Sequence, residues 1–134
     1  MVTIANGELQ VALRGMQRLA GELMSQKVSP KLMMRLRRMI RSASAVVEDV
    51  EQERQRLIKL YAKLDEAGNV VSEDVAGIKQ AVFEHFEDRA LFETSYQSLM
   101  AVTSEQPEQL TEADMEGVVC QGETVLMLGG LLEG

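Results

Sequence analysis

Few side chains of this sequence could take part in catalysis. One histidine, His85, lies in the acidic stretch FEHFED, and one cysteine, Cys120, lies far along the chain from it. A zinc site normally takes several histidine or cysteine ligands, so we interpret His85 as a surface residue of a helix. A catalytic cysteine needs a neighbouring base that lowers its pKa, so we interpret Cys120 as a packed small side chain. We therefore predict a protein that is not an enzyme and has no cofactor or metal site.

Four carboxylates occur within six residues: Glu48, Asp49, Glu51 and Glu53. Asp49 and Glu53 are one helical turn apart and would repel each other unless a cation bound them. Because Arg54 and Arg56 follow directly, we interpret the cluster as a solvated charged face of a helix. Glu53 differs, since it interrupts an apolar stripe. We predict that it forms a polar layer that fixes the register of packed helices and pairs with an arginine of a neighbouring helix.

Basic side chains provide the strongest candidates for a binding surface. The candidates are Lys31, Arg35, Arg37, Arg38 and Arg41, supported by Arg14, Arg18 and Lys27. The dipole of a helix disfavours cations near its start, so we expect these arginines to bind a partner. Residues 1–41 carry eight basic and two acidic side chains, whereas residues 42–134 carry six basic and nineteen acidic ones. This asymmetry allows pairing within one molecule, head-to-tail stacking of copies, or binding of an anion.

Two classes of partner fit this basic face. Clustered cations can bind phosphates, but no aromatic residues alternate with the arginines and the formal net charge is −7. We therefore favour protein partners, either further copies of this chain or other subunits of an assembly. A nucleic acid bound to the arginine-rich face of residues 31–41 is the alternative. We expect no membrane partner, because the longest apolar run, 125–132, contains two glycines and is too short to span a bilayer.

A long helix organises the predicted fold. Ser29 is a good N-cap and Pro30 a good first helical residue, and no glycine or proline then occurs before Gly68. The predicted helix ends near Asp65, with Gly68 as a left-handed residue after it. Its positions at alternating spacings of four and three form an apolar stripe with one polar member. They are Leu32, Leu36, Met39, Ala43, Val46, Val50, Glu53, Leu57, Leu60 and Leu64.

Further elements are predicted on both sides of the long helix. Residues 2–5 favour a short strand, and residues 8–25 favour a helix whose apolar face is Leu9, Leu13, Met16, Ala20 and Leu23. Residues 73–89 favour a helix that folds back along the long one. Residues 91–99 either continue this helix or form a strand that pairs with residues 2–5. Thr111 and Asp114 form a capping box, which predicts a last helix over residues 112–128.

These elements predict one domain, residues 1–134, of the mainly α class. Its centre is a long antiparallel helical hairpin, with two flanking helices and a small β element. The long apolar stripe, the methionine-rich faces and the apolar tail of residues 125–132 demand more burial than one copy readily provides. We therefore predict a homo-oligomer or a subunit of a larger assembly, and we add two tail leucines, Leu126 and Leu128, to the interaction candidates.

Two stretches resemble a known family. The first is Ile4-Ala5-Asn6-Gly7-Glu8-Leu9, a strand followed by an N-G-E-L turn, and the second is EQERQRLIKLYAKLDEAGN, residues 51–69. Together they resemble a family of small, uncharacterised helical proteins of bacteriophages and prophages, over residues 3–70. The resemblance implies a phage setting and supplies no catalytic residues. With the absence of a signal peptide at the first residues, it leads us to expect a virion structural or assembly protein, located in the host cytoplasm or the virion.

Overall fold

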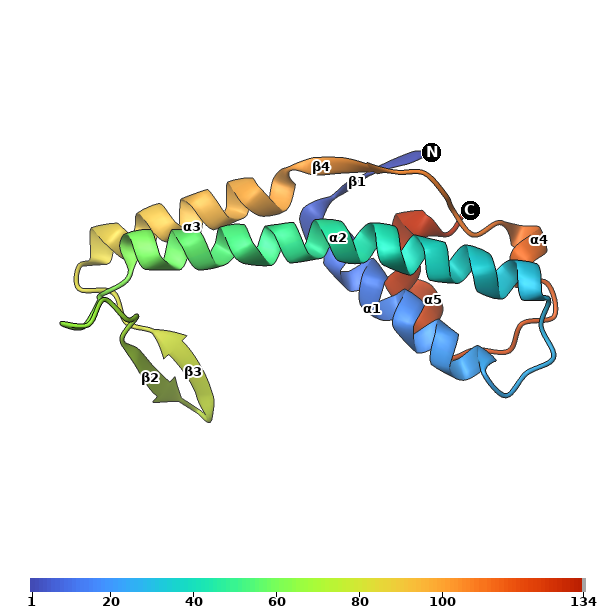
Figure 1. Cartoon of the computed structure of the whole chain (residues 1–134), viewed down its shortest axis with the longest axis horizontal. Helices are drawn as coiled ribbons and strands as arrows, with labels where there is room; N and C mark the ends of the chain where they lie inside the picture. The colour runs from blue at the N-terminus through green and yellow to red at the C-terminus, as the bar shows by residue number, and fades with distance from the viewer. Residues whose placement is uncertain (134) are drawn as a thin grey trace. The chain divides into compact units, whose positions relative to one another are not determined.

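The chain folds into a mainly α-helical structure, described for residues 1–133 by a computed structural model (Figure 1). In chain order the elements are β1 (Val2–Ala5), α1 (Asn6–Leu23), α2 (Pro30–Tyr61), β2 (Ser72–Val75), β3 (Ile78–Ala81), α3 (Phe86–Ala101), β4 (Thr103–Gln106), α4 (Glu112–Met115), α5 (Gly122–Leu128) and the 3-10 helix η1 (Gly129–Leu131). The prediction of a mainly α protein with a small β element is confirmed. Within residues 1–133, no helix combines the length and the apolar character needed to cross a membrane.

Contacts within the chain define two compact units. The terminal unit comprises residues 1–48 and the residues from 101 onward, and the middle unit comprises residues 49–100. Helix α2 contributes to both, because its residues up to Glu48 belong to the terminal unit. These units subdivide the single domain that the sequence predicts.

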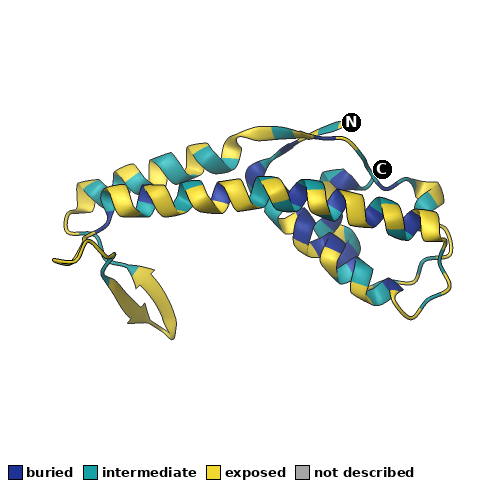
Figure 2. Ribbon diagram, viewed as in Figure 1, coloured by how far each residue is buried: buried dark blue, intermediate teal, exposed yellow. Residues whose placement is uncertain are grey.

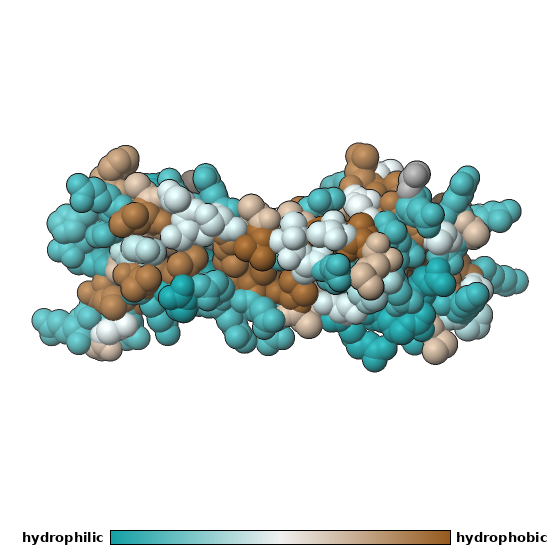
Figure 3. Space-filling model, turned by 90° about the horizontal axis from the view of Figure 1, so that it is seen from above, coloured by the Kyte–Doolittle hydropathy of each residue, from teal (hydrophilic) through white to brown (hydrophobic). Residues whose placement is uncertain are grey.

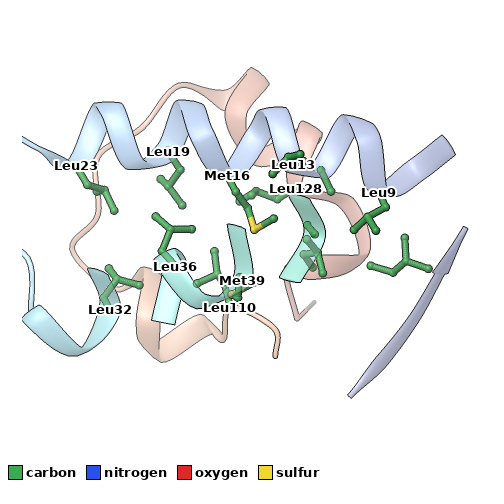
Figure 4. Packing of buried hydrophobic residues seen from close by; sticks show 14 residues of the cluster. Leu9, Leu13, Met16, Leu19, Leu23, Leu32, Leu36, Met39, Leu110 and Leu128 are labelled. Carbon is green, nitrogen blue, oxygen red and sulfur yellow. The ribbon is translucent and has the colours of Figure 1, made fainter. Parts of the chain in front are cut away.

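The terminal unit is built around the apolar face of α1. Buried residues, in dark blue, recur along α1 in Figure 2. The predicted stripe positions Leu9, Leu13, Met16 and Leu23 are buried, and so is Leu19 (Figure 4). Residues from α2 and from the last part of the chain point into the same cluster: Leu32, Leu36, Met39, Leu110 and Leu128 (Figure 4). Complete burial of each large apolar side chain stabilises a fold by about 1.5–3 kcal/mol, so this cluster is the main source of the unit's stability.

Helix α5 packs closely on α1 at Gly15. A Cβ atom at Gly15 would lie 2.8 Å from Met127 Cβ and 3.0 Å from the backbone nitrogen of Leu128, so the position has no room for a side chain. Leu128 and Leu131 are buried in the core, whereas Leu126 is 81% exposed. A large part of the apolar tail is therefore covered by the chain itself.

The predicted strand at residues 2–5 is present as β1, and its partner is β4. The two strands pair antiparallel, with Ile4 opposite Ser104. The alternative in which residues 91–99 form the pairing strand is wrong, because these residues lie in α3. Phe92 and Tyr96 alternate as strand residues would, but they are also one helical turn apart. Their rings stack with centroids 5.9 Å apart.

Helix α2 begins as predicted and ends earlier than predicted. Pro30 is its first residue, and Ser29 Oγ accepts a hydrogen bond from the backbone N–H of Leu32 at 3.1 Å. The helix ends at Tyr61 instead of Asp65. The reason for this early end lies in the turn that follows.

The turn after α2 is held by one carboxylate. Asp65 Oδ1 accepts hydrogen bonds from the backbone N–H groups of Ala67 and Asn69, both at 2.9 Å. Such local bonds from an aspartate compete with helical backbone bonds. Gly68 adopts the predicted left-handed conformation, with φ of +83°, inside this turn.

The predicted helix over residues 73–89 is wrong, and the long antiparallel helical hairpin that relied on it is not confirmed. Strands β2 and β3 form an antiparallel hairpin in this range instead. Ala76 and Gly77 connect them, with φ values of +53° and +83°, and two positive φ values suit a two-residue hairpin turn. Val75 and Ile78 pair across this turn and are exposed.

The predicted last helix over residues 112–128 is interrupted. Its start is as predicted, because Thr111 and Asp114 form the capping box. Glu116 then leaves the helical conformation, with ψ of 126°, and Gly117 has φ of +75°. The chain leaves the helix at these two residues, and residues 116–121 separate α4 from α5.

We expect Gly15→Ala to destabilise the protein by about 1–3 kcal/mol, because the new methyl group would overlap with Met127 and the backbone of α5. The measurement is the free energy of unfolding from urea denaturation. Gly21→Ala in the same helix is the control, since nothing lies within 4 Å of that position. This variant should be more stable by about 0.5–1 kcal/mol, because alanine favours helices over glycine. Equal effects at the two positions would contradict the close packing.

Candidate interaction surfaces

Two of the candidate arginines on α2 bind carboxylates of the same chain. Arg35 Nη1 donates a hydrogen bond to Asp114 Oδ2 at 2.8 Å. Arg38 donates to both oxygens of Glu108, at 3.1 and 2.9 Å. Arg35 Nε lies 4.0 Å from the same Glu108 and has no hydrogen bond among the described residues. Of the three uses that the charge asymmetry allows, pairing within the molecule therefore accounts for Arg35 and Arg38.

Both carboxylates are held in their ionised form. The hydrogen bond from Arg38 is the main cause that lowers the pKa of Glu108. Burial alone would raise the pKa of Asp114, but hydrogen bonds from Thr111 and the charge of Arg35 together outweigh burial and lower it. These pairs bind α2 to the segment that contains α4.

Arg18 of α1 also has a partner in the chain, Glu123 at 3.3 Å, whereas the remaining basic candidates of residues 31–41 are free of such partners. Lys31, Arg37 and Arg41 are exposed and form no ion pair with another residue in the range 1–133. An open groove of about 560 Å³ lies on this face of α2, and we call it the arginine groove. It is lined by Met34, Arg37, Arg38, Ile40 and Arg41. Its lining combines apolar and cationic side chains, so it suits a ligand that combines an apolar group with negative charge.

In the single chain Glu53 has a partner in its own helix. Its carboxylate accepts hydrogen bonds from Arg56 of the same helix, from Nη2 at 2.6 Å and from Nε at 2.9 Å. Residues three apart are neighbours on a helix, so no second helix is needed to neutralise Glu53. Farther along the stripe, Leu57 is buried, whereas Leu60 and Leu64 are exposed in the single chain.

The acidic cluster around residue 50 is a solvated charged face, as predicted. Hydrogen bonds from Arg54 and then Gln55 lower the pKa of Glu51 to about 2. A carboxyl group that stays ionised at neutral pH cannot act as a general acid. Glu48 and Asp49 are exposed beside it.

His85 and Cys120 lie in different units. His85 is exposed and lines an open pocket of about 500 Å³ in the middle unit. Two arginines of that pocket, Arg54 and Arg89, already bind Glu51 and Glu93. Burial, with a smaller effect of a nearby carboxylate, raises the pKa of the half-buried Cys120, which keeps the thiol protonated. Residues 1–133 contain no group of three or more His, Cys, Asp and Glu side chains that could hold a metal ion.

The middle unit exposes many of its large apolar side chains. Of residues 49–100, all of which the structure describes, the buried hydrophobic ones are Val50, Leu57 and Ala62. Helix α3 has no buried residue along its 16 positions. The exposed large hydrophobic residues are Leu60, Leu64, Val75, Ile78, Phe86 and Leu91. Hydrophobic surface of this unit appears in brown at the left of Figure 3.

Of the tail candidates, Leu126 is at the surface and Leu128 is in the core. Leu128 therefore contributes to the stability of the terminal unit, whereas Leu126 remains open to a partner. Glu108 and Asp114 bind the arginines of α2, but their sequence positions alone did not identify them as the partners of these arginines. The unequal distribution of charge along the chain indicated only that such pairing within the molecule was possible.

Comparison of the chain with protein-family models, with curated proteins and with solved structures gives no match. The candidate surfaces therefore rest on their own geometry and chemistry.

We expect Asp114→Asn to lower the free energy of unfolding by about 1 kcal/mol at neutral pH, because Arg35 loses a charged hydrogen-bond partner. The matched control is Glu112→Gln, a change of an exposed residue in the same helical turn, which should have a smaller effect. Urea denaturation measures both.

The same pair of proteins tests the pH dependence. The pKa of Asp114 is lower in the folded than in the unfolded chain, so its contribution is complete above the unfolded value, about 3.9, and is lost as the pH falls through the folded value. The stability difference between the wild type and Asp114→Asn should therefore shrink in strong acid. A difference that stays constant or grows there would contradict the assignment.

Proposed function

We propose that this chain is a non-enzymatic protein that assembles through protein–protein contacts, with further copies of itself or with other subunits. The observation that carries the proposal is the low burial of the middle unit. Its three buried hydrophobic residues contrast with the cluster of fourteen in the terminal unit. A soluble helix normally buries one apolar face, and α3 buries none of its residues.

Backbone hydrogen bonds alone do not stabilise a unit of this kind. Isolated short helices and single two-stranded hairpins are marginal in water. The ring contacts of Phe92 with Phe83 and Tyr96 add local packing, at centroid distances of 5.4 and 5.9 Å. The exposed hydrophobic residues of the unit are the natural contact for a partner, because their burial would supply the missing stabilisation.

The proposal has two further parts, a role in a phage virion or its assembly and an antiparallel pairing of two helices. The resemblance of residues 3–70 to small phage proteins supports a virion structural or assembly component, present in the host cytoplasm or the virion. We also propose that the antiparallel hairpin of the assembled protein consists of α2 and α3, in place of the range 73–89. In support, Arg54 of α2 and Phe92 of α3 line the same pocket.

A nucleic-acid-binding accessory or regulatory protein is the second candidate. The observation that favours it is the set of unpaired cations on one helix, namely Lys31, Arg37 and Arg41. Phosphate contacts of this type would make binding strongly dependent on salt. The pairing of Arg35 and Arg38 with carboxylates and the net charge of −7 make this candidate the weaker one.

Light scattering coupled to size exclusion tests the proposed assembly. We expect the purified chain to form species of two or more copies at micromolar concentration. Ile78→Lys and Leu91→Lys should each reduce the measured mass toward that of a monomer, because the two apolar residues are 64% and 52% exposed and burial of a lysine charge is unfavourable.

Met24→Lys is the control for these variants, since Met24 is 77% exposed in the terminal unit. It should leave the mass unchanged. A wild-type chain that stays monomeric at every concentration and binds no other protein would contradict the proposal. A gel shift of DNA or RNA by nanomolar protein at physiological salt would favour the second candidate instead.

A further inference from the structure

The arginine groove combines two kinds of chemistry. Met34 is 58% exposed and Ile40 is half-buried, so the groove offers apolar surface. Arg37 and Arg41 also line it, and no carboxylate of residues 1–133 forms an ion pair with them. Free phosphate would satisfy the arginines but would leave the apolar part of the groove unused. A better ligand is an exposed large hydrophobic side chain with carboxylates next to it.

The chain itself carries such a segment at the start of α3. Phe86 is 84% exposed, the largest exposed fraction among the large hydrophobic residues of the chain. Glu84, Glu87 and Asp88 surround it in the sequence, and none of them forms an ion pair within residues 1–133. We call residues 84–88 the acidic segment. It presents an aromatic ring flanked by three negative charges.

We propose that the arginine groove binds the acidic segment of a second copy of this chain, with Phe86 against Met34 and Ile40 and the carboxylates facing Arg37 and Arg41. This inference rests on the proposed function and names the partner of one of its surfaces. Charge complementarity carries the argument, because both sets of charges lack an ion pair within residues 1–133 and their signs are opposite. The aromatic ring distinguishes this occupant from a nucleic-acid backbone, which offers phosphates alone to such a rim.

The contact joins two different surfaces, and each copy carries one of each. Two copies can exchange both contacts in a closed two-fold dimer. Otherwise copies add head to tail, and they form a larger ring if the rotation closes or a filament if it does not.

Charge reversal on each side separately provides the test. The groove variant is Arg37→Glu with Arg41→Glu, and the segment variant is Glu84→Lys with Glu87→Lys. Each variant alone carries charges of equal sign on both surfaces, so each should associate at least about tenfold more weakly than the wild type. An equimolar mixture of the two should associate again, because each groove then meets a segment of opposite charge. Sedimentation velocity at low salt measures the wild type, the two variants and their mixture.

Matched controls separate this contact from general charge effects. Arg14→Glu with Lys27→Glu changes the net charge by the same amount at exposed positions away from the groove, and it should leave association unchanged. Glu48→Lys with Glu66→Lys is the equivalent control for the segment variant. Because Glu87 lies in the first turn of α3, circular dichroism checks that the segment variant keeps its helix content.

Phe86→Ala is a second variant that leaves the fold of the single chain intact, since the ring is almost fully exposed. It should weaken association at unchanged charge, whereas Met24→Ala at a similarly exposed position should not. Association that persists in the groove variant and in Phe86→Ala would overturn this inference and leave the proposed assembly function standing. A monomeric wild type would overturn the inference as well. If the wild type binds DNA at physiological salt and the groove variant does not, the groove would be assigned to nucleic acid instead.

Discussion

Packing of α1 against the last residues of the chain is the interaction on which the terminal unit depends. Gly15 lets the backbone of α5 approach so closely that Leu128 and Leu131 reach the core. Leu110, at the other side of the returning segment, is also fully buried, and its backbone N–H donates to the carbonyl of Leu131 at 2.8 Å. This anchored segment places Glu108 and Asp114 where they can bind the arginines of α2. The charge pairs therefore follow from the apolar packing.

The middle unit is held together by a different set of interactions. Backbone bonds join Lys63 to Val82 at 2.8 Å and Val71 to Lys63 at 2.9 Å, and Asp65 organises the turn between them. Little apolar surface is removed from water by this arrangement. A unit with low burial opens locally at lower free energy than a packed core does, which suits a surface that must adapt to a partner.

Features that depend on neighbouring residues could be predicted from the sequence, and features that depend on distant pairing could not. The cap at Ser29, the capping box at Thr111 and the apolar face of α1 are local, and all three are present. The hairpin at Ala76 was not predicted, because alanine rarely adopts a positive φ and is not a residue that indicates a two-residue hairpin turn. The basic surface was found as a group, but its division into paired and unpaired arginines needed the position of residues 108–114.

The pairing of β1 with β4 and the packing of α1 on α5 have a consequence for folding during synthesis on the ribosome. Both contacts join segments that are separated by about a hundred residues of chain. While a ribosome is still making the intervening residues, the leucines of α1 lack their C-terminal partners, so part of their apolar surface stays open to solvent. Contacts of such long sequence separation also slow folding, because a large loop must close first. The nascent chain therefore passes through a stage in which chaperones have a clear apolar target.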